Sequence, residues 1–290
     1  MTDCHSGLRV VRPETFGPIP VENGAPEGML AIGASLHAVS GVAGRLAVLA
    51  DHRACGALEI TGDPGGTIYL QDGYLAFAES PAAPDLGSRL VNSRRVLVDQ
   101  WRRADQDSQP DGCAGDVLLR RGLIDAAEWQ ALIRSAALDA LLALALAGGS
   151  GVPPAAPAAR ASFIHGQARC AGSVLRMDAA AAWAHARQEA ERLAGRGVLP
   201  DARPQWCGPG RDRLVFSRPA TAVLRQFDGR ATVRELAWRN GLALYGVMDW
   251  VVHLIHDGVC VITPQDADIR WSPPDPDVLR DALAALRQLT

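Results

Sequence analysis

Two groups of side chains in this sequence have the types and spacing that could support chemistry. His253 and His256 lie three residues apart on one predicted helix and Cys260 follows them, a spacing that could supply metal ligands. No carboxylate or further Cys/His cluster completes a site locally, so we interpret these imidazoles as partly buried and hydrogen-bonded. His52 and Cys55 could form a base and a nucleophile, but packing is the better interpretation at a tight turn before a strand. We therefore predict no catalytic residue, no cofactor and no metal.

The basic residues of the chain are all arginine, which removes several enzyme classes. The 290-residue sequence contains 29 basic residues, and lysine is absent. A Walker A phosphate loop, a pyridoxal Schiff base and a protein-kinase active site each need a specific lysine amine. The six cysteines are scattered singly, without the close pairs of a zinc knuckle or a disulfide framework. We therefore expect a protein that is not an enzyme.

The overall composition is that of a packed globular protein. Hydrophobic residues make up 48% of the chain and charged residues 21%, outside the range of disordered sequences. The N-terminus lacks the apolar core of a signal peptide, and the longest apolar run, 136–147, is too short for a membrane span and contains Asp139. The formal net charge of -3 gives no global attraction to nucleic acid or anionic lipid. We expect a cytoplasmic protein without membrane contact.

The elements that would position these residues begin with a small β-meander. Apolar residues at three- and four-residue spacing predict a helix over 36–49. Strands are predicted at 56–61, 67–71 and 74–78. Asp72-Gly73 joins the last two and is a strong hairpin signal, because a type I′ turn needs positive φ at both central residues. A sheet of about three strands would leave open edges, which a partner could extend by strand addition.

Helices are predicted in the stretch that follows the meander. The pattern predicts one helix over 86–103, with its arginines, Arg89 among them, mostly on a solvated face. A polar linker is expected over 104–112. Beyond it, a short helix, a glycine stop and a new N-cap at Asp125 predict a helical hairpin whose second helix ends at Leu146.

The second half of the chain contains a low-complexity break and then a compact helical pattern. Asp178 is the predicted N-cap of a helix that ends at Ala194, and irregular structure is expected over 196–210. Three helices and a closing strand then fit a winged-helix or helix-turn-helix unit. These helices are predicted at 217–227, 233–239 and 244–256, the strand at 259–262 and a last amphipathic helix at 277–289. The predicted organisation is a mobile N-terminal arm (1–27), an α+β domain with a helical hairpin (28–147), a linker (148–161), a connecting strand and helix (162–210), a winged-helix-like domain (211–264) and a C-terminal helix (265–290).

Three stretches of the sequence resemble parts of a known bacterial family. The stretch LAVLADHRACGALEITGDPGGTIYLQDGYLAFAE resembles the PATAN-type domain, whose pattern it matches at Arg53, Gly56, Asp72, Gly73 and Ala78. The stretch GDVLLRRGLIDAAEWQALI is similar to a short helical module of secretion and pilus assembly ATPases. The segments DAAAAWAHARQEAERLAGRGVLP and VLRQFDGRATVRELAWRNGL are similar to the C-terminal half of longer PATAN-type proteins, where the unit after DGR is winged-helix-like.

This resemblance implies an interaction or signalling module linked to bacterial regulation. It covers roughly residues 29–263 and carries over no established catalytic residue. In some of the ATPase relatives the short helical module binds a cyclic dinucleotide, but this sequence lacks the long paired motif that such binding needs.

The predicted helix-turn-helix raises the possibility of DNA binding. Its second helix, 244–256, offers no Arg, Lys, Asn or Gln for base edges and carries Asp249 instead. The segment before it is more basic, and over 211–263 seven arginines stand against five acidic residues, a small excess for a DNA module. The residues that could contact DNA phosphates or a partner protein are Arg225, Arg230, Arg234 and Arg239.

These observations favour protein binding over DNA binding. Tryptophan is enriched at interfaces, and Trp271, between Arg270 and Ser-Pro-Pro, is the most plausible exposed anchor. Core packing is expected for most of the others. We expect an α+β protein, a small antiparallel meander packed with helices, with a helical extension and a C-terminal winged-helix-like domain. The expected function is that of a signalling or regulatory adaptor that binds a partner protein or itself, and the alternative is a DNA-binding transcriptional regulator.

Overall fold

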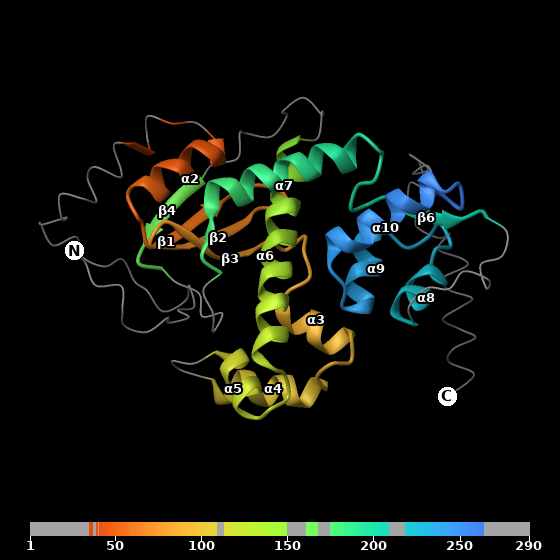
Figure 1. The fold of residues 1–290 in the computed structure, drawn as a ribbon, viewed down its shortest axis with the longest axis horizontal. Coiled ribbons are helices and arrows are strands. Elements are labelled where there is room, and N and C mark those ends of the chain that lie inside the picture. Colours follow the sequence, from red (N-terminus) through yellow and green to blue (C-terminus); the bar gives the residue numbers. More distant parts are fainter. Residues whose placement is uncertain are drawn as a thin grey trace, which may run out of the picture.

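The computed structural model describes residues 35–36, 39, 41–108, 113–149, 161–167, 175–208 and 218–263. The fold is α+β, with a five-stranded antiparallel sheet, a two-stranded sheet and helices around both. In Figure 1 the long helix α6 stands between the larger sheet and the C-terminal helices. The predicted N-terminal arm, most of the predicted linker, the last helix and Trp271 lie outside the described residues.

The predicted meander is present and follows a helix. Helix α2 (Gly41–Asp51) leads into β1 (Gly56–Ile60), β2 (Gly66–Gln71) and β3 (Tyr74–Glu79). The turn between β2 and β3 has φ values of 51° at Asp72 and 79° at Gly73, as a type I′ turn requires. A Cβ at Gly73 would lie 2.7 Å from a carbonyl oxygen of the preceding helix. The Asp72-Gly73 pair therefore fits both the local turn and the close approach of α2.

The sheet contains two strands besides the meander, one at the start of the predicted connecting strand and one that the sequence did not predict. Strand β4 (Ala161–His165) pairs with β1, and the short β5 (Met177–Asp178) pairs with β3, so the order is β4-β1-β2-β3-β5. Both edges of the meander, which we expected to be open, are thus paired at least in part. Helix α7 (Ala179–Ala194) follows, and Asp178 caps it by accepting the Ala181 N–H at 2.7 Å. The segment predicted as a connection therefore completes the first sheet.

The predicted single helix over 86–103 is wrong. Two helices occupy this stretch, α3 (Leu86–Asn92) and α4 (Val98–Asp107). The chain reverses after α3 because Arg94 adopts a left-handed φ of 61° and the Arg95 N–H donates to the Leu90 carbonyl at 2.9 Å. The helix α4 also extends into the predicted linker 104–112. In the sequence, two short amphipathic helices joined by a polar turn have the same pattern as one continuous helix.

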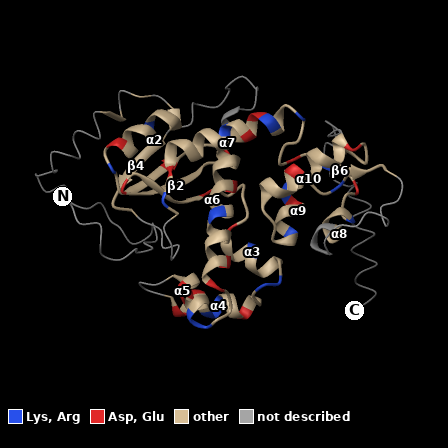
Figure 2. Cartoon of the chain, in the orientation of Figure 1, with Lys and Arg blue, Asp and Glu red and all other residues tan. Residues whose placement is uncertain are grey.

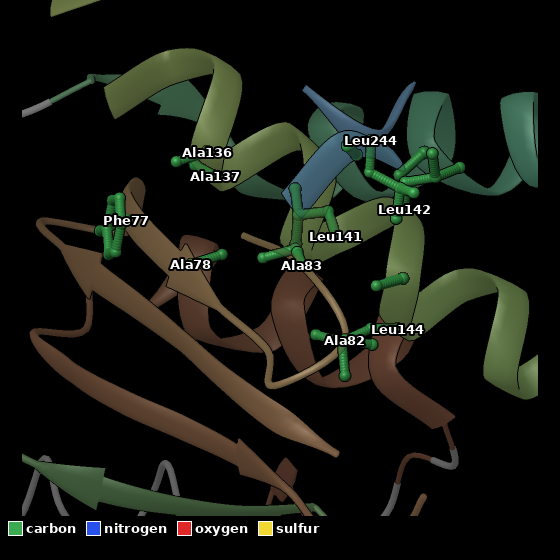
Figure 3. Packing of buried hydrophobic residues seen from close by; sticks show 14 of the residues in the cluster. Phe77, Ala78, Ala82, Ala83, Ala136, Ala137, Leu141, Leu142, Leu144 and Leu244 are labelled. Atoms are coloured by element: carbon green, nitrogen blue, oxygen red, sulfur yellow. The ribbon is translucent and has the colours of Figure 1, made fainter. Parts of the chain in front are cut away.

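Helix α6 (Ala126–Gly149) forms the centre of the molecule. It follows α5 (Ala114–Arg120), and Asp125 caps it as predicted by accepting the Glu128 N–H at 2.7 Å. Every residue from 136 to 145 is buried except Leu138, which is half-buried. Figure 3 shows Ala136, Leu141 and Leu142 of α6 with Phe77 of β3 towards one side and Leu244 towards another. A helix that is apolar all round is buried in this way.

By length and composition α6 could also cross a membrane. The most apolar window of this helix is 56% buried inside the protein. The sequence prediction that this run is too short for a span considered only 136–147, whereas the helix is longer.

The C-terminal part contains three helices and a two-stranded sheet. The elements are β6 (Arg203–Trp206), α8 (Arg218–Leu224), α9 (Val233–Asn240), α10 (Leu244–His256) and β7 (Cys260–Thr263). The three helices and the closing strand were predicted. Strand β6 was not, because its partner β7 lies more than fifty residues further along the chain and the segment 196–210 has no strand pattern of its own.

Candidate functional site at the junction of α6, α7 and α10

A buried ion pair joins α3 to α6. The Arg89 guanidinium bonds to the Asp139 carboxylate, and their side chains are only 2% and 1% exposed. Arg89 also donates to the Pro84 carbonyl at 2.9 Å and to the Ser135 hydroxyl at 3.0 Å. The prediction that Arg89 lies on a solvated face is therefore wrong. The early end of α3 lets this helix approach α6 with Arg89 directed inwards.

Asp139 also caps a helix that lies far away in the sequence. Its carboxylate accepts the Leu244 N–H at 2.5 Å and the Tyr245 N–H at 3.0 Å. These are the first amides of α10, whose N-cap residue, Ala243, has no side-chain acceptor. A carboxylate at a helix N-terminus satisfies free amides and interacts favourably with the helix dipole. The start of α10 is therefore fixed on α6.

The environment of Asp139 acts on its pKa in two directions. Burial raises the pKa of this carboxyl above its ordinary value, and Arg89 and the two amides of α10 oppose that shift. A buried charge is tolerated only where several partners compensate for its lost hydration. Asp139 has three such partners, so removing any one of them leaves a costly imbalance.

A second polar cluster joins α7 to α10 nearer the surface. Arg192 bonds to Glu189 at 2.7 Å and to Asp249 at 2.9 Å, while the Tyr245 hydroxyl donates to Glu189 at 3.2 Å. The hydrogen bond with Glu189 is the main cause that raises the pKa of Arg192, so its guanidinium stays charged. Arg192 is 36% exposed and Asp249 29%, which weakens the interaction through solvent screening.

A cavity of about 300 Å³ lies beside these two clusters and opens to solvent. Its walls are mostly apolar and come from α6, α7 and the start of α10. The small side chains at this junction leave space between the helices. The residues that shape the cavity include Ala131, Ser135, Leu138, Ala186, Ala243 and Tyr245.

The predicted surface arginines do not gather at this junction. Arg225 and Arg230 are exposed, Arg234 lies 3.4 Å from Asp201 and Arg239 lies 3.6 Å from Glu235. In Figure 2 basic and acidic positions alternate over the helices of both parts of the molecule. The described part of the chain therefore has no continuous basic stripe along α10, whose own acidic residue, Asp249, is paired with Arg192.

The histidines singled out by the sequence are more exposed than predicted. His253 and His256 are both exposed, and His253 Nε2 lies 3.4 Å from the Asp249 carboxylate. Cys260, the third residue of the predicted group, is buried. Over the described residues, no group of three or more His, Cys, Asp or Glu side chains could hold a metal ion.

His52 and Cys55, the other pair considered in the sequence, lie in different environments. His52 is exposed, whereas Cys55 is half-buried and its Sγ accepts the Asp72 N–H at 3.2 Å. This contact belongs to the turn that supports the hairpin.

Sequence reasoning missed the Arg89–Asp139 pair although a signal for it was present. Asp139 is the single acidic residue in the apolar run 136–147. A carboxylate inside a buried helix needs a charged or hydrogen-bonding partner, so this residue pointed to a buried site. The identity of the partner could not be read from the sequence.

Comparisons with protein-family models, with characterised proteins and with solved structures find no match for this chain. The resemblance to PATAN-type proteins and the winged-helix assignment therefore stay predictions.

Proposed function

We propose that this protein is a non-enzymatic regulatory or signalling adaptor that acts by binding another protein or a second copy of itself. The observation that carries the proposal is the position of α10. In helix-turn-helix proteins the first residues of the second helix contact base edges in the major groove. Here the backbone amides of the first two residues of α10 bond to the buried Asp139, which holds this end of the helix against α6.

The rest of α10 is equally unsuited to a DNA groove. One face of the helix is buried, and its members are Leu244, Val247, Met248, Val251, Val252 and Leu254. Its acidic residue, Asp249, would face phosphates with the wrong charge if Arg192 were displaced. The start of this helix is bonded to a carboxylate that is 1% exposed, and its first residue, Leu244, is buried.

The charge of the C-terminal part favours a protein partner. Residues 218–263 contain five arginines and four acidic residues, so the excess of positive charge is small. Arg225 and Arg230 are exposed and suit an acidic surface on a partner. The same two residues are what favours the alternative, a DNA-binding regulator, because they could contact phosphates outside a groove.

Binding of the full chain to labelled duplex DNA separates the two functions. We expect weak binding at about 0.05 M salt, with no preference among sequences. Affinity that is high at low salt, depends on sequence and falls by roughly 10³ or more at about 0.2 M salt would overturn the adaptor proposal.

Photocrosslinking from defined positions tests the protein partner directly. A crosslinking residue placed at position 225 or 230 of the full chain should give a discrete protein adduct in cells. The matched control is position 187, which is exposed on a different helix, α7. Equal adducts from all three positions, or adducts with DNA alone, would contradict the proposal.

A further inference from the structure

The cavity at the junction of α6, α7 and α10 has the size and lining of a small ligand site. Its volume of about 300 Å³ lies at the lower end of the range for ligand pockets, roughly 300 to 1,000 Å³. Such pockets are mostly apolar with a few polar groups that orient the ligand. Leu138 is the one residue of 136–145 that is not fully buried, and it faces this space. The gap in the packing of the central helix therefore coincides with the cavity.

The charged groups of the cavity fall into two classes. The acidic side chains, Asp139 and Glu189, are already bonded to Arg89 and Arg192. The basic side chains, Arg134 and His185, are exposed and have no ionic partner among the described residues. The charge left for a ligand to complement is therefore the positive charge of Arg134.

The Ser135 hydroxyl adds a polar group beside the buried ion pair. It accepts a hydrogen bond from Arg89 at 3.0 Å, and within the described chain no group accepts the proton of this hydroxyl. A hydroxyl can accept and donate at the same time, so Ser135 can donate to an acceptor in the cavity.

We infer that this cavity binds a small amphipathic carboxylate, with its apolar body against Leu138 and Ala186 and its acidic group at Arg134. A bidentate Arg–carboxylate contact gives both energy and direction. Because Ala243 and Tyr245 form one wall, the bound molecule contacts α10 as well as α6 and α7. A ligand that binds only the folded junction stabilises it by mass action. This inference does not depend on the proposed protein partner.

Calorimetric titration of the full chain with sodium octanoate tests the site. We expect saturable binding of one molecule per chain and a higher melting temperature. Octan-1-ol and octylammonium should bind at least about tenfold more weakly, because they lack the charge that Arg134 complements. Equal affinity for the three compounds, or no saturable binding of octanoate, would overturn the inference.

Two variants locate the binding. Ala131→Phe fills the mouth of the cavity from an exposed position on α6, so the fold should tolerate it while octanoate binding is lost. Arg134→Gln should weaken octanoate binding by about tenfold and leave octan-1-ol binding unchanged. The matched control is Arg103→Gln on α4, which removes the same charge outside the cavity and should change neither affinity. Unchanged octanoate binding in Ala131→Phe, or an equal loss in Arg103→Gln, would place the ligand elsewhere.

Discussion

Helix α10 is held by two polar contacts that use the same chemical groups in different surroundings. At its start, Asp139 and Arg89 are almost completely buried. One turn further along α10, Asp249 bonds to Arg192 of α7, and both side chains are about one-third exposed. A buried pair that loses one member leaves an uncompensated charge, whereas an exposed pair that loses one member regains hydration. We therefore expect burial, more than the number of hydrogen bonds, to determine how strongly a polar contact fixes this junction.

Removal of the buried carboxylate should have the largest effect. Asp139→Ala leaves Arg89 buried without its partner and leaves two amides of α10 without an acceptor. We expect the free energy of unfolding to fall by about 3–5 kcal/mol. Urea denaturation of the full chain measures this loss. A loss below about 1 kcal/mol would mean that the junction does not depend on the buried pair.

Replacement of both members of the pair is the matched control. Arg89→Leu combined with Asp139→Leu removes both charges and fills their space with apolar groups. This double variant should be more stable than Asp139→Ala, with a remaining loss of about 1 kcal/mol from the uncapped helix. If the double variant lost as much free energy of unfolding as the two single variants added together, the charges would not depend on each other, and this would contradict the interpretation of a coupled buried pair.

Removal of a local helix cap should lower the free energy of unfolding less than removal of the remote cap, Asp139. Asp178 accepts the Ala181 N–H at 2.7 Å and is itself exposed. Asp178→Ala should therefore lower the free energy of unfolding by about 1 kcal/mol, which is typical of a lost N-cap. Thermal unfolding of this variant beside Asp139→Ala gives the comparison. Asp178→Ser, which keeps a side-chain acceptor, should recover most of the loss.

Loss of the partly exposed cluster should have the smallest effect. Arg192→Gln removes the charge that bonds Glu189 and Asp249, and we expect a loss of about 0.5 kcal/mol at low salt that shrinks at high salt. Denaturation at two salt concentrations measures it. The control is Arg187→Gln, because the ion pair of Arg187 with Glu191 stays within α7. If Arg192→Gln lowered the free energy of unfolding as much as Asp139→Ala, the buried and the partly exposed contact would not differ in strength as we propose.

Much of the secondary structure could be predicted from the sequence because its signals are local. The Asp72-Gly73 turn, the caps at Asp125 and Asp178, and α10 each depend on residues within a few positions of one another. The split between α3 and α4 was missed although it is also local, because the sequence around Arg94 has neither glycine nor proline to mark a reversal. Arg94 adopts the left-handed conformation that usually favours glycine.

The tertiary structure alone decided which distant segments meet. The pairing of β4 with β1 joins residues about 100 positions apart, and β6 is a strand only because β7 lies beside it. The sequence determined that the apolar run 136–147 is helical and contains one acidic residue, Asp139. Only the packing decided that Arg89 neutralises this residue and that α10 is capped by it. Periodicity and capping act within a few residues, whereas burial and charge pairing depend on which surfaces come together.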